Sequence, residues 1–447
     1  MKDPYKNHLH LEPPKGLLND PNGVSYFKGR YYVFHQWDRF ACDHTYKEWG
    51  LFTSTDLLLW QHEGSALVPD SFEDHAGVYS GSAVVVADKL QLFYTGNSKQ
   101  AGKRKSYQKR ALSVDGRSYL KYPGQKTPSD LTEHHRDPKV VKVNDEWWML
   151  VGSQTKENYQ GAVALYTSAD LKAWTYQGLL YSAKELDQMC ECPDLLLFDN
   201  TAVLLVCPQK RDLRTDTDIS SYSGYYLGKL NGQSFKPQSS LQKLDQGFDF
   251  YAPQTFKDEQ GRYLLWAWMS RMDAQAEKNC PTQKFSYLHC LTLPRVLTLE
   301  DGKLYQRPPV EYLRARRLVE TSKAKKFEFI YETGVNVLEL SFLESVTELY
   351  FEFTGGWRLI YQKKTLCLER KSWVDGKAEK RCFALAELKK LELYIDRSAL
   401  EIFINDGQEV MAARYFNEAK RAKLVGSCQT KHTSNYYQLE LEERKDG

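Results

Sequence analysis

The stretch DPNGVSYFKGRYYVFHQW, residues 20–37, decides the fold because it has the pattern of a β-hairpin and recurs along the chain. It has a proline-containing opening, a β-forming run, a polar turn and a second run rich in aromatic residues, which together predict two paired strands. Four further copies follow: GSAVVVADKLQLFYTG (81–96), DPKVVKVNDEWWMLVGSQ (137–154), CPDLLLFDNTAVLLVCPQ (192–209) and APQTFKDEQGRYLLWAWM (252–269). Measured from Asp20, Ser82, Asp137, Cys192 and Ala252, the spacings are 62, 55, 55 and 60 residues.

A second phrase recurs between these hairpins. TSTDL at 53–57 runs on to Trp60 and Gly64, and TSADL at 167–171 runs on to Trp174 and Gly178. Weaker copies are LSVDGRSYLKY from Leu112 and LGKLNGQSFKP from Leu227. We interpret these segments as the outer strands of each unit. Five units of four strands predict a five-bladed β-propeller.

Three acidic motifs stand at the openings of these hairpins. They are NDPNG at 19–23, RDP at 136–138 and ECPD at 191–194. The innermost strands of a propeller surround a central funnel, so residues at the start of those strands line one end of it. The repeat therefore predicts that Asp20, Asp137 and Glu191 converge at that end, with Ser80 and Tyr251 nearby.

The composition excludes several classes of function. The net charge is only +3, from 61 basic and 58 acidic residues, which gives no reason to expect nucleic acid or an anionic membrane as a partner. The opening MKDPYKNHLHLEPPKG lacks the apolar core of a signal peptide, and no stretch is long and apolar enough to span a membrane. The nine cysteines are expected to be free thiols in a reducing cytoplasm. Cys190 and Cys192 have no second Cys or His pair at zinc-site spacing, so no metal is expected.

A second domain follows the repeat. After Arg295 the pattern fades, LYQRPP at 304–309 resembles a linker, and residues 311–320 are expected to form a short helix. Short alternating strands then follow, such as VNVLELSF (335–342) and LEIFIND (400–406), which predict a β-sandwich. The expected division is a propeller over 1–305, a linker over 306–321 and a sandwich over 322–447. Asp396, Arg397 and Glu401 in the sandwich are interpreted as an ion pair at a strand edge rather than a catalytic cluster.

Convergent carboxyl groups in different environments are the equipment of glycoside hydrolysis. The uncharged neighbours of Glu191 are expected to desolvate it and raise its pKa, as an acid/base residue requires. Asn19 and Asn22 are expected to hydrogen-bond an ionised Asp20, the nucleophile. Arg136 is expected to hold Asp137 ionised. A carboxyl separation of about 5–5.5 Å predicts a retaining reaction through a covalent intermediate.

The motifs together resemble glycoside hydrolase family 32, the invertase and sucrose-6-phosphate hydrolase family. The matching segments are HLEP (10–13), GLLNDPNG (16–23), GVYSGSA (77–83), FYTG (93–96), RDPK (136–139), ECPD (191–194), DFYAPQ (249–254), DRS (396–398) and EIFINDG (401–407). They occur in the family's order over nearly the whole chain. The resemblance implies a five-bladed propeller followed by a β-sandwich.

The resemblance also implies roles for individual residues. Asp20 would be the nucleophile that attacks a β-fructofuranosyl unit, Glu191 the general acid and then base, and Asp137 the residue that holds fructose hydroxyls. The fructose subsite would be shaped by Asn19, Gln36, Trp49, Tyr79, Ser80, Arg136 and Trp268. No cofactor is implied.

The substrate implied is sucrose 6-phosphate or sucrose, hydrolysed in the cytoplasm. A phosphate site requires cations at the pocket mouth, and the candidates are His44, Lys47, Arg104 and Arg211, although a solvated-surface role is favoured for each. The alternatives are a fructan- or inulin-type exo-hydrolase, a fructosyltransferase, and a non-catalytic sugar-binding propeller. The set of three carboxyls argues against the last.

The sequence departs from the family pattern at four positions. Leu17 and Leu18 replace a Trp-Met pair, Leu51 replaces a His, and Cys190 stands where a Trp often precedes the acid/base residue. The sequence therefore does not predict how the outer pocket and the leaving-group subsite are built. The oligomeric state and the role of the sandwich are not predicted by the sequence.

Overall fold

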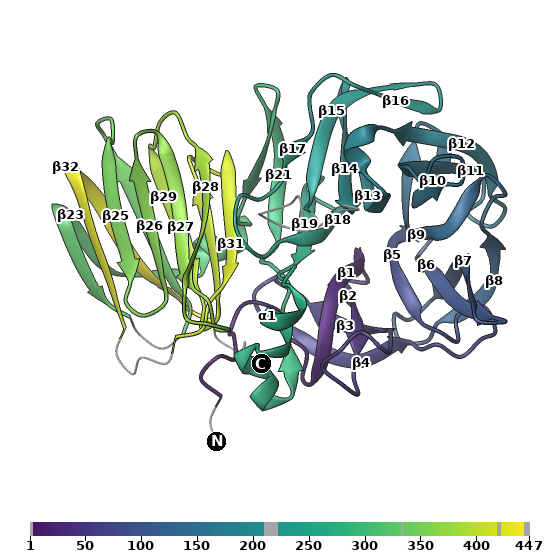
Figure 1. The fold of residues 1–447 in the computed structure, drawn as a ribbon, viewed down its shortest axis with the longest axis horizontal. Coiled ribbons are helices and arrows are strands. Elements are labelled where there is room, and N and C mark those ends of the chain that lie inside the picture. Colours follow the sequence, from purple (N-terminus) through teal and green to yellow (C-terminus); the bar gives the residue numbers. More distant parts are fainter. Residues whose placement is uncertain (1–2, 210–221, 332–333, 418–421, 442–447) are drawn as a thin grey trace.

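The computed structural model describes the chain except for residues 1–2, 210–221, 332–333, 418–421 and 442–447. Five antiparallel sheets are arranged around a common centre, and a separate all-β unit stands beside them (Figure 1). The predicted fold class, a five-bladed β-propeller followed by a β-sandwich, is confirmed.

Each predicted hairpin forms the two innermost strands of one blade, and the recurring TSTDL-type phrases lie between the outer strands. Blade 1 is β1 (Gly16–Phe27), β2 (Arg30–Asp38), β3 (Glu48–Ser54) and β4 (Gln61–Leu67), with β20 (Tyr287–Leu288) added beside β1. Blade 2 is β5 (Val78–Val86), β6 (Lys89–Gln100), β7 (Lys103–Ser113) and β8 (Leu120–Lys126). Blade 3 is β9 (Leu131–Val143), β10 (Glu146–Thr155), β11 (Gly161–Ser168) and β12 (Thr175–Ser182).

The last two blades carry small additions. Blade 4 is β13 (Met189–Phe198), β14 (Thr201–Gln209), β15 (Gly224–Asn231) and β16 (Ser234–Pro237), with β17 (Gln242–Lys243) paired to β15. Blade 5 is β18 (Tyr251–Lys257), β19 (Tyr263–Trp268), β21 (Arg295–Glu300) and β22 (Lys303–Arg307). The short helix α1 (Ala274–Lys278) lies between β19 and β21.

Burial differs between the middle and the outer strands of each blade. Every residue of β3 and β11 is buried, because neighbouring blades pack on both faces of these middle strands. The outer strands β4 and β12 instead alternate between exposed and half-buried residues, as expected where one face meets water.

The innermost strand of every blade carries a register shift at the same place. The shifts fall between Leu18 and Pro21, Tyr79 and Gly81, Arg136 and Lys139, Glu191 and Asp194, and Tyr251 and Gln254. A β-bulge inserts an unpaired residue, bends the strand and re-aims the side chains around it. The five bulges therefore turn the motif residues of five blades toward one end of the funnel.

The sandwich has two layers joined by two long strands. β32 (Lys423–Leu439) pairs with β25 (Glu348–Phe353) through its first half and with β24 (Asn336–Phe342) through its second half, while β23 (Arg316–Ile330) runs along its other edge. The remaining strands extend the layers: β26 (Trp357–Gln362), β27 (Thr365–Lys371) and β28 (Ala378–Ala384) on one, and β29 (Lys390–Ile395), β30 (Ala399–Ile404) and β31 (Glu409–Arg414) on the other.

The segment between the two parts is short and structured. β22 ends at Arg307, the helix α2 spans Val310–Arg314, and β23 begins at Arg316. The residues expected as a linker, 306–321, thus include the end of one strand, this helix and the start of another strand. The helix expected over 311–320 is one turn long, because the chain enters β23 directly.

A buried cluster of charged residues, here called the interdomain ion cluster, joins the propeller to the sandwich. The Nδ1 of His10 lies 3.0 Å from Oδ2 of Asp396, and its Nε2 lies 3.3 Å from Oε1 of Glu401. Arg295 of β21 lies 2.7 Å from Glu401, and the backbone N–H groups of Leu9 and His10 donate to Asp396. The interpretation of Asp396, Arg397 and Glu401 as a strand-edge ion pair was wrong, because Asp396 and Glu401 pair with His10 and Arg295 of the propeller part of the chain.

The cysteines differ from the expectation at one pair. Cys367 and Cys382 form a disulfide, whereas the other seven cysteines are free. The two residues stand directly opposite each other on β27 and β28, which brings their sulfur atoms together. The expectation that all nine were free thiols was therefore wrong, since strand register is not visible in cysteine spacing.

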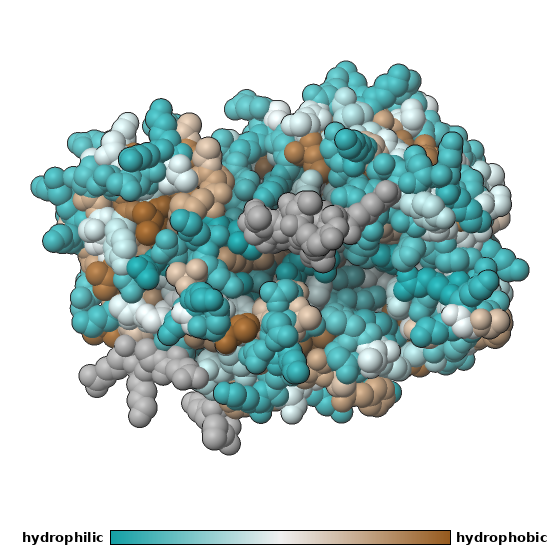
Figure 2. All heavy atoms as spheres, viewed as in Figure 1, coloured by the Kyte–Doolittle hydropathy of each residue, from teal (hydrophilic) through white to brown (hydrophobic). Residues whose placement is uncertain are grey.

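The surface seen in Figure 2 is mostly hydrophilic, with apolar residues scattered or in small groups. Within the described parts of the chain, no helix is long and apolar enough to cross a membrane.

Candidate active site

The three predicted carboxyls come from blades 1, 3 and 4 and lie at one end of the funnel. Asp20 is on β1, Asp137 on β9 and Glu191 on β13, each at or beside the bulge of an innermost strand. The charge of Glu191 contributes to raising the pKa values of both Asp20 and Asp137, so the three groups lie within electrostatic reach of one another.

Asp20 is held by two hydrogen bonds. The Oγ of Ser80 donates to its Oδ2 at 2.6 Å, and the Nδ2 of Asn19 lies 3.2 Å from its Oδ1. Burial raises the pKa of Asp20, these hydrogen bonds oppose the shift, and the charge of Glu191 adds to it. The result is an oriented carboxyl with an unfavourable environment for its charge, which is typical of a functional group.

Asn19 is itself positioned by two buried neighbours. Its Nδ2 donates to Oε1 of Gln36 at 2.7 Å, and its Oδ1 accepts from Nζ of Lys47 at 2.6 Å. Burial lowers the pKa of Lys47 to about 8, against the opposing charge of Asp20. Lys47 therefore supports the nucleophile's neighbour from within the protein.

Asp137 has a strained backbone and a polar cradle. Its φ is 66°, in the left-handed region, and its N–H donates to Oγ1 of Thr95 at 3.0 Å. Its Oδ2 accepts from the N–H of Cys192 at 3.1 Å, while Nε of Arg136 is 4.0 Å away. Burial raises the pKa of Asp137 to about 7 despite Arg136, and the charges of Glu191 and Asp20 reinforce the rise.

Glu191 receives the strongest set of donors in the site. Nη2 of Arg136 lies 2.6 Å from Oε1, and Oε2 accepts from Nε2 of Gln209 at 2.6 Å and from the hydroxyl of Tyr251 at 2.7 Å. Burial raises the pKa of Glu191, but the charge of Arg136 and the hydrogen bonds from Tyr251 and Arg136 outweigh burial and lower it.

The expected pKa shifts of the three carboxyls were wrong in direction. Glu191 was expected to have a raised pKa and Asp20 and Asp137 to be held ionised, whereas the pKa shifts run the opposite way. The physical reason is that burial raises the pKa values of Asp20 and Asp137, while Arg136 compensates Glu191. Its guanidinium points across to Glu191 in the next blade instead of to Asp137 beside it in sequence.

The remaining residues expected to shape the subsite fall into two groups. The Tyr79 hydroxyl accepts from Arg104 and the Trp268 ring packs edge-on against His44, and the indole Nε1 of Trp268 has no hydrogen-bond partner among the described residues. Trp49 is fully buried in the core between blades 1 and 2, and its Nε1 donates to the carbonyl of Tyr79 at 3.0 Å. Trp49 thus contacts the site only through the backbone beside Ser80.

Sequence reasoning missed two supporting residues, Gln209 and Thr95. Gln209 holds Glu191, and Thr95 holds the backbone of Asp137. Gln209 ends the second strand of the fourth hairpin, in a position similar to that of Gln36 in the first hairpin. The repeat therefore contained a signal for this glutamine.

The phosphate candidates also differ from one another. Lys47 is buried against Asn19, and His44 lies 2.9 Å from Lys47 and 3.1 Å from Glu277. Arg104 is half-buried and its Nη2 donates to the hydroxyl of Tyr79 at 3.2 Å. Arg211 lies outside the described residues.

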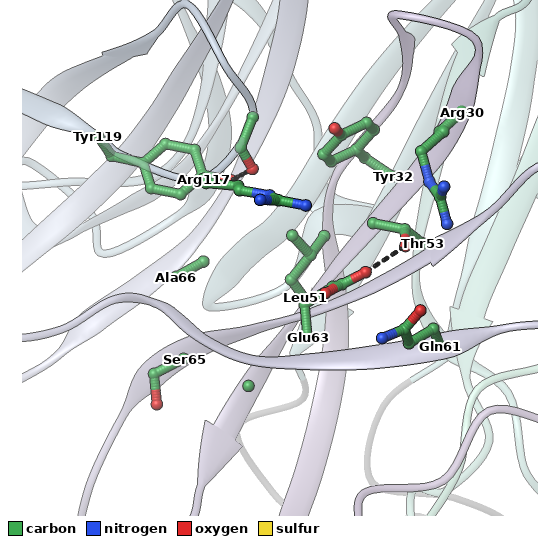
Figure 3. Close-up of a pocket in the computed structure, with 12 residues that line it drawn as sticks. Arg30, Tyr32, Leu51, Thr53, Gln61, Glu63, Ser65, Ala66, Arg117 and Tyr119 are labelled. Carbon is green, nitrogen blue, oxygen red and sulfur yellow. Dashed lines mark hydrogen bonds between the residues drawn. The ribbon is translucent and has the colours of Figure 1, made fainter.

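The four departures from the family pattern are buried behind the site. Leu17, Leu18 and Cys190 are fully buried in hydrophobic clusters, and Leu51 is 4% exposed. Leu51 faces a separate cavity of about 360 Å³ between blades 1 and 2, where Glu63 accepts a hydrogen bond from Thr53 (Figure 3). Cys190 lies beside the site, with its Sγ 3.8 Å from the backbone carbonyl oxygen of Glu191.

The described residues contain no group of three or more His, Cys, Asp or Glu side chains arranged to hold a metal ion. The site thus consists of carboxyls, their donors and aromatic rings. Convergent buried carboxyls at the mouth of a propeller define the protein as a glycoside hydrolase.

Comparisons with known proteins specify the class further. Residues 10–308 match the glycosyl hydrolases family 32 N-terminal domain, and residues 316–440 match the family 32 C-terminal domain. The chain is 39% identical to a sucrose-6-phosphate hydrolase of Bacillus subtilis, over 97% of this chain and 93% of that protein. It is 36% identical to one of Klebsiella pneumoniae, over 93% and 90%.

Solved structures agree with these relatives. The sucrose-6-phosphate hydrolase of Lactobacillus gasseri superposes with a TM-score of 0.86 at 30% identity, covering 98% of this chain and 94% of that chain. A Bombyx mori β-fructofuranosidase mutant in complex with sucrose gives 0.85 at 27% identity, covering 98% and 95%. The chain belongs to glycoside hydrolase family 32.

Proposed function

We propose that the protein is a retaining β-fructofuranosidase that hydrolyses sucrose 6-phosphate, and also sucrose, by double displacement. The observation that carries the proposal is the convergence of Asp20, Asp137 and Glu191, at the bulges of blades 1, 3 and 4, each with its own set of donors. The sucrose-6-phosphate hydrolases at 36–39% identity support the choice of substrate.

In the first step Asp20 attacks C2 of the fructosyl unit while Glu191 protonates the glycosidic oxygen. A C2–Oδ bond forms, the C2–O bond to the glucosyl group breaks, and the glucosyl product leaves with the proton from Glu191. Ser80 and Asn19 hold the attacking carboxyl in place, which lowers the cost of orienting it.

In the second step Glu191 acts as the base. It takes a proton from water, the water oxygen attacks C2, and the bond to Asp20 breaks to release fructose. The same residue gives and then regains one proton, so the cycle is balanced.

The pairing of Arg136 with Glu191 implies a coupling between binding and protonation. The first step requires a protonated Glu191, but Arg136 favours its ionised form. Hydroxyls of the fructosyl unit that bind Arg136 and Asp137 would draw the guanidinium away from Glu191. Its pKa would then rise when the substrate is in place.

A substrate panel tests the proposal. We expect the highest kcat/KM for sucrose 6-phosphate, a lower value for sucrose and raffinose, and the lowest for inulin. Equal values for sucrose and its 6-phosphate would remove the phosphate preference. Release of fructose from inulin at the rate of sucrose would favour an exo-fructosidase, and transfer of fructose to sucrose would favour a fructosyltransferase.

We also propose that the enzyme acts in the cytoplasm. Seven free cysteines support a reducing compartment, while the bond between Cys367 and Cys382 runs against it. Counting reactive thiols in the denatured protein from freshly lysed cells tests this. Nine thiols would show that the bond between Cys367 and Cys382 is reduced in the cell and would support the cytoplasm, whereas seven would show that the bond persists there and would contradict it.

A further inference from the structure

The tip of the β6–β7 hairpin carries an unusual concentration of positive charge. The segment SKQAGKRKS, residues 98–106, contains four cations and no acidic residue. The two strands are joined at Ala101 and Gly102 and remain paired up to Gln100 and Lys103, at the tip of the hairpin in blade 2. Of these cations, Arg104 is one of the residues considered above for a phosphate site.

The register of the hairpin places two of the cations against each other. Lys99 stands directly opposite Arg104, and Gln100 stands opposite Lys103. Opposed residues of an antiparallel pair share one face of the sheet, and like charges in such a pair are destabilising. Because side chains alternate along a strand, Asn97, Lys99 and Arg104 lie on one face, and Lys103 lies on the other.

The face with Lys99 and Arg104 contacts the side chain of Tyr79. Nδ2 of Asn97 and Nη2 of Arg104 each lie 3.2 Å from the hydroxyl of Tyr79, and the Arg104 guanidinium is 5.5 Å from the centre of the Tyr79 ring. Tyr79 precedes Ser80, the residue that donates to Asp20. A tyrosine therefore links this hairpin directly to the nucleophile's support.

Lys105 and Lys109 nearby are paired with carboxylates, whereas Lys99 and Arg104 have no such partner among the described residues. Lys105 is 2.9 Å from Glu133, and Lys109 is 2.5 Å from Glu73. Across the part of the chain that the structure describes, no carboxylate forms an ion pair with Arg104 or Lys99. An arginine has five N–H donors, and the contact with Tyr79 occupies few of them.

We propose that Arg104, assisted by Lys99, binds the phosphate of a phosphorylated sugar in the leaving-group subsite. This inference rests on the proposed function and specifies how the 6-phosphate is recognised. The guanidinium fork matches phosphate oxygens bidentately, and a dianion there relieves the repulsion between Arg104 and Lys99. His44 and Lys47 are less available, because Glu277 and Asn19 already bind them.

The substitution Arg104→Gln tests the assignment, with Lys103→Gln as the matched control on the opposite face of the same strand. We expect Arg104→Gln to lower the ratio of kcat/KM for sucrose 6-phosphate to that for sucrose by roughly 10- to 100-fold, the loss typical of a charged hydrogen-bonding partner. Lys99→Gln should give a smaller fall. Lys103→Gln should leave the ratio within about twofold, as expected for an exposed charge.

A second variant distinguishes the effect of the Arg104 charge from the effect of its hydrogen bond to Tyr79. Tyr79→Phe removes the hydroxyl that Arg104 contacts but keeps the guanidinium, so the ratio should be retained even where both rates fall. Inhibition of sucrose hydrolysis by glucose 6-phosphate should weaken in Arg104→Gln, while inhibition by glucose should not.

The outcomes separate the two proposals. An unchanged ratio in Arg104→Gln, with a wild type that prefers sucrose 6-phosphate, overturns the assignment of Arg104 alone. A wild type that hydrolyses both sugars equally overturns the phosphate site but leaves a β-fructofuranosidase. A wild type that hydrolyses neither overturns the proposed function.

Discussion

The protein buries two clusters of charged residues, the interdomain ion cluster and the active-site carboxyls at the funnel mouth. The carboxyls of the two clusters differ in how far neighbouring groups compensate their charge. In the interdomain ion cluster, His10 and Arg295 neutralise Asp396 and Glu401. Burial raises the pKa values of these two carboxyls, but hydrogen bonds and charges from the cations outweigh it and lower them. At the funnel mouth, Arg136 is drawn to Glu191, and the pKa values of Asp20 and Asp137 are raised.

The difference shows what separates a structural from a catalytic carboxyl here. Burial alone does not, because both clusters are buried. What differs is whether each charge has its own partner. Asp396 accepts three backbone N–H groups from residues 8–10 as well as the His10 ring, whereas Asp20 has two uncharged side-chain donors. A carboxyl left without full compensation is poised for chemistry.

The largest effect on activity is expected from removing Asp20, the nucleophile, whose charge is poorly compensated. Asp20→Asn should lower kcat/KM by on the order of 10⁴-fold or more, because no carboxylate remains to attack C2. The melting temperature should not fall, since the ionised Asp20 is disfavoured by its surroundings. Hydrolysis within tenfold of the wild-type rate would show that Asp20 is not the nucleophile.

The fully compensated carboxyl should show the reverse behaviour. Asp396→Asn is expected to lower the free energy of unfolding by about 3–5 kcal/mol, because it leaves the His10 cation and several N–H groups poorly paired. The activity of the folded fraction should change little. The control Asp406→Asn, an exposed carboxyl beside Lys390, should cost less than about 1 kcal/mol in urea unfolding. Loss of turnover in folded Asp396→Asn would contradict the assignment of a purely structural role to the interdomain ion cluster.

A smaller effect tests the direction of Arg136. Removing this charge by Arg136→Gln should raise the pKa of Glu191, so the protonated acid persists to higher pH. The basic limb of the pH profile of kcat/KM should therefore move up by about one pH unit, in addition to any fall in the maximum value of kcat/KM. The substitution Lys103→Gln should leave the limb in place. An unmoved basic limb, with the acidic limb shifted up instead, would place the guanidinium's influence on Asp137.

Much of the fold could be predicted because its pattern is local. The sequence of a hairpin such as residues 137–154 predicts both strands and the turn between them. Five copies at regular spacing are compatible with few folds other than a propeller. The sandwich strands were similarly visible as short alternating runs. The convergence of Asp20, Asp137 and Glu191 follows from their equivalent places in the repeat.

The pairing of side chains could not be predicted, because it depends on backbone geometry at single residues. The positive φ of Asp137 in its bulge separates its carboxyl from Arg136 and leaves the guanidinium free to reach Glu191. The contact of Asp396 with residues 8–10 joins segments almost 400 positions apart, so no local pattern could show it. The same holds for the register that joins Cys367 to Cys382.

The central claim is that Asp20 attacks the sugar while Glu191 moves the proton, and trapping the covalent intermediate tests it most directly. Glu191→Gln should hydrolyse sucrose slowly but react faster with a fructoside that carries an activated leaving group, which needs less protonation. The fructosyl-enzyme should then accumulate, because no base activates water. Peptide mass spectrometry of the rapidly quenched reaction should find one fructosyl unit on Asp20. A fructosyl unit on Asp137, or no adduct despite a burst of leaving group, would contradict the account.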